Sequence, residues 1–389
     1  MNSDRKKIYM DYAATTPLSR DVLDKMMPYL TEEFGNASSV HSFGRNTRAA
    51  VEKAREQVAA VLNCEKGEVY FTSGGTESDN WAIRGFAHKN RKKGSHIITS
   101  QIEHHANLHT CKRLEKEGLR VTYLPVDEYG ILRLDALKDA ITDETILVSI
   151  MFANNEIGTI QPIKQIGDIC RQNNIAFHTD AVQAVGHVPI DVKDMNIDML
   201  SLSAHKFYGP KGVGALYVRK GIRLDNLMEG GAQESAKRSG TYNHPGIIGL
   251  GYAINRAAEH MEAEAKRLAV LRDRLVKGIL ENISDTRLNG HPEQRLPNNA
   301  NISIEYVEGE AMLLHLDFAG IAVSSGSACT SGSLDPSHVL LAMGLSHGTA
   351  HGSIRFSLGE DTTEEDVDYC VGTLKNIVER LRQMSPLLG

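Results

Sequence analysis

The chain has 389 residues, 41% hydrophobic and 24% charged, a balance typical of a soluble globular protein with room for a large and a smaller domain. Its formal net charge of -6 gives no basic field for a nucleic-acid backbone, which argues against nucleic acid as the main partner. No signal peptide opens the chain and no apolar run approaches the ~18 residues of a membrane span, so we expect a cytoplasmic protein without membrane contact.

Helical patterns alternate with short apolar runs between about residues 18 and 220. The stretch 51–63 predicts an amphipathic helix, because apolar side chains recur there at helical spacing. The predicted strands are 68–75, 95–100, 145–154, 175–180, 198–203 and 214–219. Most of these runs are apolar throughout rather than alternating, which is typical of strands buried on both faces. The pattern predicts an α/β architecture with a mainly parallel sheet between helices.

A second region follows the glycine-rich stretch 230–243. A long helical pattern over about 245–282 is predicted to bridge to a smaller domain. That domain has predicted strands at 300–307, 320–325 and 353–359. Its final helix is predicted to open with a capping box formed by Thr362 and Glu365.

Residues whose side chains can bind a ligand or react cluster at predicted strand ends, where ligands gather in open α/β sheets. Gly74, Gly75 and Thr76 follow the strand 68–75 and offer backbone N–H groups and a hydroxyl to a phosphate, although a glycine turn that only ends the strand fits equally well. Asp180 and Lys206 each end a later strand, about one helical crossover apart, so both can face one pocket.

A lysine in an apolar, glycine-flanked stretch suits a nucleophilic amine, because burial lowers the pKa of lysine. A Schiff base with pyridoxal phosphate is one such use, and that cofactor also needs a carboxylate at its ring nitrogen and a phosphate cradle. Asp180 can supply the carboxylate. The cradle residues would be Gly75, Thr76, Ser203 and His205. Taken alone, the pattern around Lys206 also fits a lysine at the protein surface. The pattern around Asp180 also fits a residue that caps a helix.

Neither the histidines nor the cysteines predict a metal site. His104 and His105 are adjacent and lack the spacing of a zinc-binding helix, so a structural or stacking role is favoured. The cysteines are odd in number and scattered, which supports neither a disulfide framework nor a thiolate zinc site. Those on predicted helices, Cys111, Cys170 and Cys370, are predicted to be buried.

Several motifs in this order resemble those of pyridoxal-phosphate-dependent cysteine desulfurases of the NifS/IscS type. The motifs are TSGGTESDN (72–80), EHHAN (103–107), ANNEIG (153–158), HTDAVQ (178–183), SAHKFYGPKG (203–212), RSGT (238–241) and SSGSACTSGS (324–333). The resemblance spans nearly the whole chain and implies the fold type I of the class V aminotransferase superfamily. It implies an N-terminal segment 1–15 that packs with the small domain, a large cofactor-binding domain 16–260, and a small α+β domain 261–389 that carries the catalytic cysteine and the substrate arginine.

The resemblance also implies how pyridoxal 5'-phosphate is held. Lys206 would bind it covalently, Asp180 would pair with its ring nitrogen, and Gln183 would bond its phenolic oxygen. His104 would stack on the ring and act as an acid or base, and Asn155 would reach the cofactor and the substrate. The phosphate would be bound at Gly75, Thr76, Ser203 and His205, together with Thr241 of the partner subunit in a homodimer.

The proposed substrate is L-cysteine, with its carboxylate on Arg355, whose guanidinium matches a carboxylate with two bonds. Read in isolation, Arg355 also fits a surface salt bridge. Cys329 lies among small residues with little apolar content to bury a thiol. The resemblance implies that Cys329 takes the sulfur as a persulfide, leaving L-alanine, and transfers it to acceptors such as an iron-sulfur scaffold protein.

Two other interpretations remain open at this point. A selenocysteine lyase or small-substrate aminotransferase of the same superfamily would share the chemistry of Lys206 and Asp180 and differ at Cys329. A non-enzymatic assembly protein would need no intact cofactor pocket. The sequence does not determine which acceptor or pathway receives the sulfur.

Overall fold

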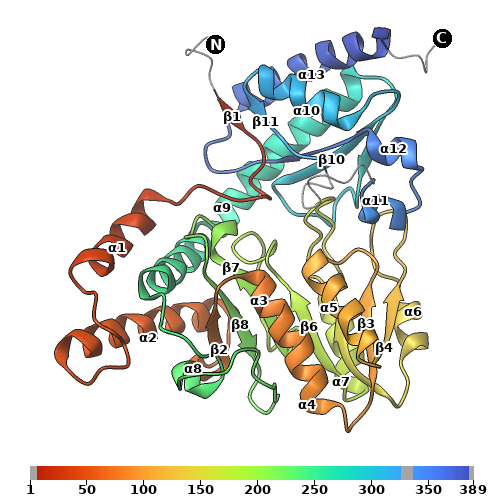
Figure 1. Ribbon diagram of the computed structural model, residues 1–389. Coiled ribbons are helices and arrows are strands. Elements are labelled where there is room, and N and C mark those ends of the chain that lie inside the picture. Colours follow the sequence, from red (N-terminus) through yellow and green to blue (C-terminus); the bar gives the residue numbers. More distant parts are fainter. Residues whose placement is uncertain (1–6, 326–335, 385–389) are drawn as a thin grey trace.

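A seven-stranded sheet forms the middle of the larger part of the molecule in the computed structural model, which describes residues 7–325 and 336–384 (Figure 1). Its strands, in the order β2-β8-β7-β6-β5-β3-β4, are β2 (Val69–Thr72), β8 (Gly214–Val218), β7 (Met199–Ser203), β6 (Ala176–Asp180), β5 (Thr145–Ser149), β3 (His96–Ser100) and β4 (Arg120–Leu124). The strands from β7 to β4 are parallel to one another, and β8 runs antiparallel to β7 and β2. The predicted α/β architecture with a mainly parallel sheet is confirmed.

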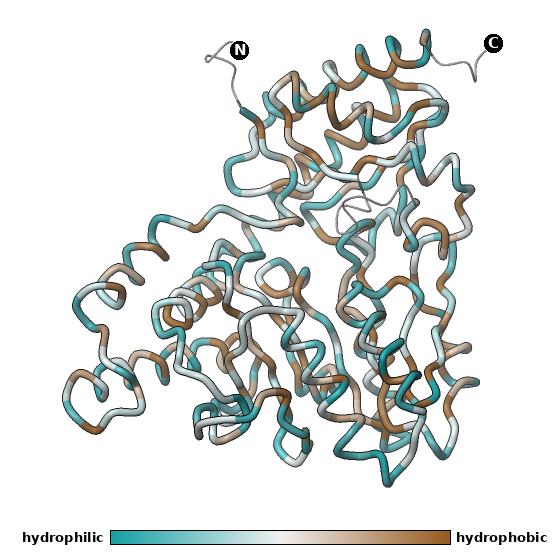
Figure 2. The backbone as a smooth tube through the Cα atoms, in the orientation of Figure 1, coloured by the Kyte–Doolittle hydropathy of each residue, from teal (hydrophilic) through white to brown (hydrophobic). Residues whose placement is uncertain are grey.

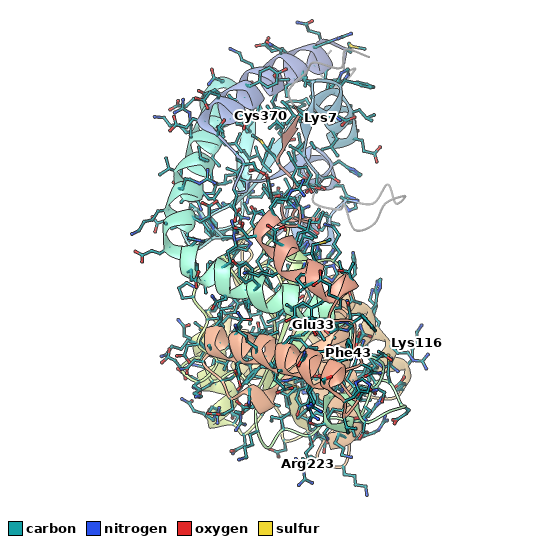
Figure 3. The ribbon with its side chains drawn as sticks, turned by 90° about the vertical axis from the view of Figure 1, so that its left-hand side faces the viewer. Lys7, Glu33, Phe43, Lys116, Arg223 and Cys370 are labelled. Carbon is teal, nitrogen blue, oxygen red and sulfur yellow. The ribbon has the colours of Figure 1, made fainter. Side chains whose placement is uncertain are left out.

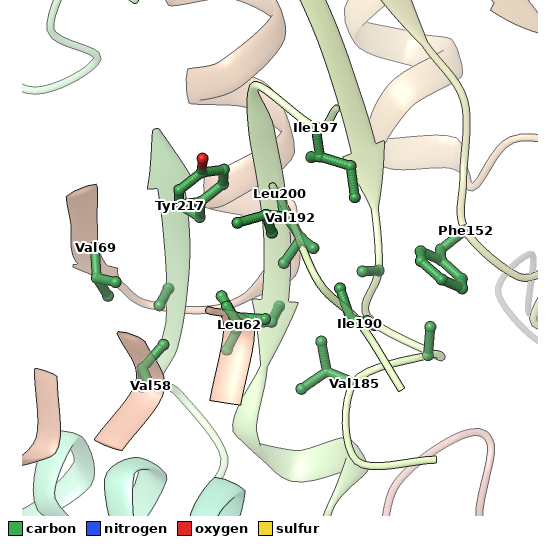
Figure 4. Close-up of a cluster of buried hydrophobic side chains, with 14 of the residues drawn as sticks. Val58, Leu62, Val69, Phe152, Val185, Ile190, Val192, Ile197, Leu200 and Tyr217 are labelled. Atoms are coloured by element: carbon green, nitrogen blue, oxygen red, sulfur yellow. The ribbon is translucent and has the colours of Figure 1, made fainter. Parts of the chain in front are cut away.

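Helices cover both faces of this sheet, so that all residues of β3, β5, β6, β7 and β8 are buried. On one face lie α3 (Gly75–Asn80), a π-helical turn (Trp81–Gly85), α4 (Phe86–Asn90) and α5 (His105–Lys116), with Trp81, Phe86 and Leu114 in their core. The other face carries α2 (Ser42–Leu62), α6 (Leu134–Ala140), α7 (Ile163–Gln172) and the first part of α9 (His244–Asn282). Figure 4 shows Val58 and Leu62 of α2 beside Tyr217 and Leu200 of the sheet.

The predicted helix 51–63 is the second half of α2, which begins at Ser42. The sequence does not indicate the first half of α2, residues 42–50, because these turns carry a glycine and polar residues. His41 instead starts the helix by accepting a hydrogen bond from the Gly44 N–H at its Nδ1. A short helix, α1 (Arg20–Thr31), precedes α2 and packs on α9.

The smaller part is an antiparallel sheet backed by helices. Its strand order is β12 (Ser353–Ser357), β10 (Asn299–Ile304), β9 (Thr286–Asn289), and the helices are the second part of α9, α10 (Gly309–Phe318) and α13 (Glu364–Met384). Side chains alternate along the strands: Ile302 and Phe356 belong to the apolar core under the helices. Their neighbours Asn301 and Arg355 bond instead to the large part of the molecule. Figure 2 shows hydrophobic and hydrophilic residues alternating along the chain in both parts.

The N-terminal segment joins the two parts. Strand β1 (Ile8–Tyr9) pairs in parallel with β11 (Ile321–Ala322), and Met10 is buried in the small core. The chain then crosses to the large part, where the Thr16 N–H donates to the His205 carbonyl. The domain boundaries at residues 16 and 261 stay predictions; helix α9 runs through residue 261 without interruption.

The last helix begins one residue later than predicted. The capping box at Thr362 and Glu365 is wrong: the reciprocal bonds join Thr363 and Asp366, whose N–H groups each donate to the other's side chain. Thr362 uses its hydroxyl to accept from the Gly359 N–H and so closes the preceding turn. The remaining short helices are α8 (Gln233–Ala236), α11 (His338–Ala342) and α12 (His347–His351).

Within residues 7–325 and 336–384, no helix is both long enough and apolar enough to cross a membrane.

Candidate active site

A cavity of about 300 Å³ opens at the carboxyl edge of the large sheet. It is lined by all of the predicted cofactor and substrate residues that the structure describes, except Thr241: Gly75, Thr76, His104, Asn155, Asp180, Gln183, Ser203, His205, Lys206 and Arg355. The sequence analysis missed Ala13, Ala14, Asp79, Met151, Ala153 and Val182, which complete the lining. The cavity therefore collects side chains from distant parts of the chain, as expected at this edge of an α/β sheet.

Lys206 enters the cavity from a 3-10 turn (Ala204–Lys206) directly after β7. Phe207, 2% exposed, fixes the far side of this turn in the core. The Lys206 Nζ donates to the carbonyl oxygens of Ala13 and Ala14 at 2.6 and 2.8 Å. The N-terminal segment thus orients the amine, a role that the sequence analysis did not assign.

Asp180 is the last residue of β6 and is 6% exposed. Its Oδ1 accepts from the Val182 N–H at 3.0 Å, which aims the carboxyl at the cavity. Burial raises the pKa of Asp180, and the charges of His104 and Lys206, together with the Val182 bond, act to lower it. The structure brings Asp180 and Lys206 into one cavity, as their spacing predicted.

Backbone and hydroxyl donors gather where β2 passes into α3. A Cβ on Gly75 would lie 2.6 Å from the Val182 Cγ2, so only glycine fits at this position of the lining. Thr76, Ser203 and His205 stand around the same corner. Burial lowers the pKa of His205 to about 4, so its ring is neutral at pH 7. This corner can receive an anionic group through hydrogen bonds without a fixed positive charge from His205.

The remaining polar lining residues are held by the protein itself. His104 caps α5, with its Nδ1 accepting from the Ala106 N–H at 3.2 Å. The rings of His104 and His105 lie 6.4 Å apart at 55°, so the two adjacent histidines do not converge on one point. Gln183 donates through Nε2 to the Ala13 carbonyl at 2.9 Å.

Arg355 is the small domain's contribution to the lining. It is 3% exposed, which excludes a surface salt bridge. Its Nη1 donates to the Asn155 carbonyl at 3.0 Å and its Nη2 to Asp11 Oδ1 at 2.8 Å. Its Nε has no hydrogen-bond partner among the described residues. A buried guanidinium at a cavity wall can bind a carboxylate.

Two predicted site residues lie elsewhere. Thr241 is exposed and lines a neighbouring depression with Ser73 and Arg238, not the cavity of its own chain, so its contribution through a partner subunit stays a prediction. Cys329 lies outside the described residues.

The other cysteines do not compete with Cys329 for the role of nucleophile. Cys111, Cys170 and Cys370 are buried in helices as predicted, and burial raises the pKa of Cys111 and of Cys370 to about 12. Figure 3 shows Cys370 in the small domain, among its helices. Cys64 is half-buried, and burial raises its pKa to about 12. None of these four thiols lines the cavity.

The chain matches the aminotransferase class-V family over residues 8–370. A protein named cysteine desulfurase IscS from Clostridium botulinum strain Hall is 60% identical over 384 residues, covering 98% of this chain and 97% of that protein. A protein of the same name from Methanosarcina thermophila is 58% identical and covers 100% of this chain and 96% of its own length.

Solved structures agree. A NifS-like protein superposes with a TM-score of 0.91 at 40% identity, over 97% of this chain and 100% of the other. SspA in complex with cysteine superposes with a TM-score of 0.81 at 40% identity, over 91% and 99%.

Proposed function

The chain belongs to the aminotransferase class-V family, and we propose that the cavity at the carboxyl edge of its large sheet binds pyridoxal 5'-phosphate and L-cysteine. It is a pyridoxal-phosphate-dependent cysteine desulfurase of fold type I. The observation that supports this cavity as the site is the meeting of three groups in it: the amine of Lys206, the buried carboxyl of Asp180 and the guanidinium of Arg355.

The lining fits the cofactor. An amine for covalent attachment and a carboxyl for the ring nitrogen share one cavity, and a corner of hydroxyl and N–H donors can take the phosphate. Lys206, Asp180, Gln183 and His104 would hold the ring. Gly75, Thr76, Ser203 and His205 would hold the phosphate, joined by the partner subunit's Thr241. When bound, the cofactor supplies an electron sink for bond breaking next to the substrate's α-carbon.

The protein's own groups position the substrate and move its protons. Arg355 binds the α-carboxylate of L-cysteine with its guanidinium fork, and Asn155 approaches the same group. The Lys206 Nζ takes the proton from the α-carbon as a base, and Asp180 keeps a proton on the ring nitrogen by pairing with it. His104 stands at the cavity wall as the second acid or base.

Cys329 removes the sulfur. Its thiolate forms a bond to the sulfur of L-cysteine while the substrate's carbon–sulfur bond breaks, and the electron pair of the broken bond stays with the carbon fragment. That fragment takes up a proton at its β-carbon, regains a proton at its α-carbon from Lys206, and leaves as L-alanine, while Cys329 keeps a persulfide. Acceptor proteins such as an iron-sulfur scaffold would then receive this sulfur.

Incubation of the purified protein with L-cysteine and a thiol reductant tests the proposal. We expect alanine and sulfide in equal amounts from the wild type, and neither above background from Cys329→Ala. Cys64→Ala is the matched control and should keep full turnover. Sulfide release that persists in Cys329→Ala would assign the chain to a lyase, and keto acid in place of alanine would assign it to an aminotransferase.

A further inference from the structure

A row of buried polar side chains crosses the large sheet beneath the cavity. Thr99, Ser149, His178 and Ser201 lie on the adjacent strands β3, β5, β6 and β7, and each is 0% exposed. The strand pairing sets Thr99 opposite Ser149 and Ser149 opposite His178. Helices cover both faces of these strands, so a buried polar side chain here needs a partner within the protein.

The bonds of this row run in one direction. His178 lies between two hydroxyls, with its Nδ1 2.8 Å from Ser149 Oγ and its Nε2 3.0 Å from Ser201 Oγ. Burial lowers the pKa of His178 to about 3, so its ring is neutral, with one donor and one acceptor nitrogen. Ser201 acts to lower the pKa of Asp79. If Ser149 donates to Nδ1 of His178, the ring carries its proton on Nε2 and donates to Ser201.

Asp79 is the end of this row and also part of the cavity lining. It comes from α3 and is 1% exposed. Its Oδ1 lies 3.7 Å from the Nε2 of His178 and has no hydrogen-bond partner among the described residues. The catalytic scheme above gives Asp79 no role.

Asp79 and Asp180 are the carboxyl groups among the described lining residues, and two buried carboxyls in one cavity resist joint ionisation. Asp180 is favoured as the charged one, because the Val182 N–H, His104 and Lys206 all stabilise its anion. Asp79 faces Ser201 and the neutral His178, with the carboxyls of Asp180 and Glu103 nearby. Burial, followed by the charge of Asp180, raises the pKa of Asp79 well above its ordinary value.

We propose that Asp79 is a positioning residue: as a neutral carboxylic acid it leaves Asp180 as the charged carboxylate that pairs with the cofactor's ring nitrogen. The pairing itself rests on the function proposed above. The neutral state of Asp79 rests on its burial, on its Oδ1 having no hydrogen-bond partner among the described residues, and on the cavity that it shares with Asp180.

Infrared spectra of protein labelled with ¹³C only in its aspartate carboxyl groups test this state at pH 7. We expect the wild type to show the carbonyl stretch of a protonated aspartic acid. Asp79→Asn should lose that band, and Asp180→Asn should retain it. A wild type without the band overturns the proposal, and so does a band that survives Asp79→Asn but disappears in Asp180→Asn. The wild-type result stands even if a variant fails to fold.

The pH dependence of cofactor affinity supplies a second readout. Because an amide imitates a neutral acid, Asp79→Asn should leave the pH profile of pyridoxal phosphate binding unchanged, whatever its effect on the affinity itself. A profile displaced by about one pH unit or more would mean that the substitution removed a charge, which contradicts a neutral Asp79. A wild type that does not bind the cofactor would defeat the proposed function while leaving the infrared result interpretable.

Discussion

The large sheet bonds many of its buried polar side chains across neighbouring strands, whereas the small sheet devotes a whole face to them. In the large sheet one row joins Ser149, His178 and Ser201, and a second set joins His96 to Thr145 and Thr122. In the small sheet Asn289 donates to Asn301 and Ser303, both at 2.8 Å, and the Asn301 amide reaches the Glu156 carbonyl of the large part.

The difference follows from what covers each surface. Helices cover both faces of the large sheet, so buried polar groups such as Ser149, His178 and Ser201 bond to one another across its strands. The polar face of the small sheet rests on backbone carbonyls of residues 155 and 156, so its side chains satisfy groups of the other part. The large sheet therefore supplies the reactive groups, and the small sheet supplies a hydrogen-bonded surface that sets Arg355 in place.

The largest expected effect comes from Lys206→Ala, which tests whether the large part supplies the reactive amine. We expect turnover of L-cysteine to fall by more than about 10⁴-fold, because covalent attachment and proton transfer are both lost. Alanine production measures the loss. Lys211→Ala is the matched control: Lys211 donates to the Thr16 carbonyl outside the cavity lining, and its loss should change turnover little. Comparable losses in both variants would contradict the assignment.

A smaller effect is expected from Arg355→Lys. This variant keeps a positive charge at residue 355 but replaces the forked guanidinium by a single ammonium group. The KM for L-cysteine should rise by about 100-fold, because one ammonium cannot replace the paired bonds of a guanidinium. Steady-state kinetics measure it. Arg274→Lys, at an exposed pair with Asp368, should leave KM unchanged. An unaltered KM in Arg355→Lys would place the substrate carboxylate elsewhere.

Asn301→Ala tests whether hydrogen bonds hold the small polar face in place. The variant leaves the Asn289 amide with Ser303 as its remaining bond and the Glu156 carbonyl without its donor from Asn301. We expect a loss of about 2 kcal/mol in the free energy of unfolding in urea. Ile302→Val, on the apolar face, should cost about 1 kcal/mol. If Asn301→Ala costs less than Ile302→Val, the polar face contributes little to holding the parts together.

The smallest effect is a pH dependence at the contact between the two parts. Burial raises the pKa of Glu156, which accepts a bond from the Ser337 hydroxyl, to about 7. The folded state then retains a proton that the unfolded state has lost between pH about 4.5 and about 7, so stability falls as pH rises through this window. Glu156→Gln, which titrates nothing, should reduce that fall by at least about 1 kcal/mol.

Urea unfolding at several pH values measures this difference. Burial also raises the pKa of Glu103 to about 7. Glu103 therefore also makes the free energy of unfolding fall as pH rises, and it does so in the variant as well. An identical pH dependence in the wild type and Glu156→Gln would show that Glu156 keeps an ordinary pKa.

The sequence was sufficient for six of the seven strands of the large sheet and for the residues at their ends, but it missed β4 (Arg120–Leu124). Buried parallel strands read as continuous apolar runs, and strand ends at one edge of a sheet are neighbours whatever their separation along the chain. The family resemblance added the roles of residues such as Gln183 and Arg355, which no local pattern assigns.

What the sequence did not predict depends on contacts between distant segments. Ala13 and Ala14 act through backbone carbonyls, which leave no trace in residue type. Asp79 follows a glycine turn and looks like an ordinary helix residue until the row of Ser149, His178 and Ser201 is seen beneath it. The helix cap at Thr363 was misplaced by one residue because adjacent threonines offer the same signal.

The parallel pairing of β1 with β11 has a consequence for biosynthesis. Residues 8 and 9 leave the ribosome first, yet their partners are residues 321 and 322, and Met10 accepts from the Ser357 N–H. The large sheet can form as soon as its own strands are made, since domains fold as units during synthesis. The carbonyls that orient Lys206 lie between this late pairing and the bonds that the large part makes to Ala13 and Thr16. The N-terminal segment therefore reaches its final place between the two parts only when strands β11 and β12 have been made.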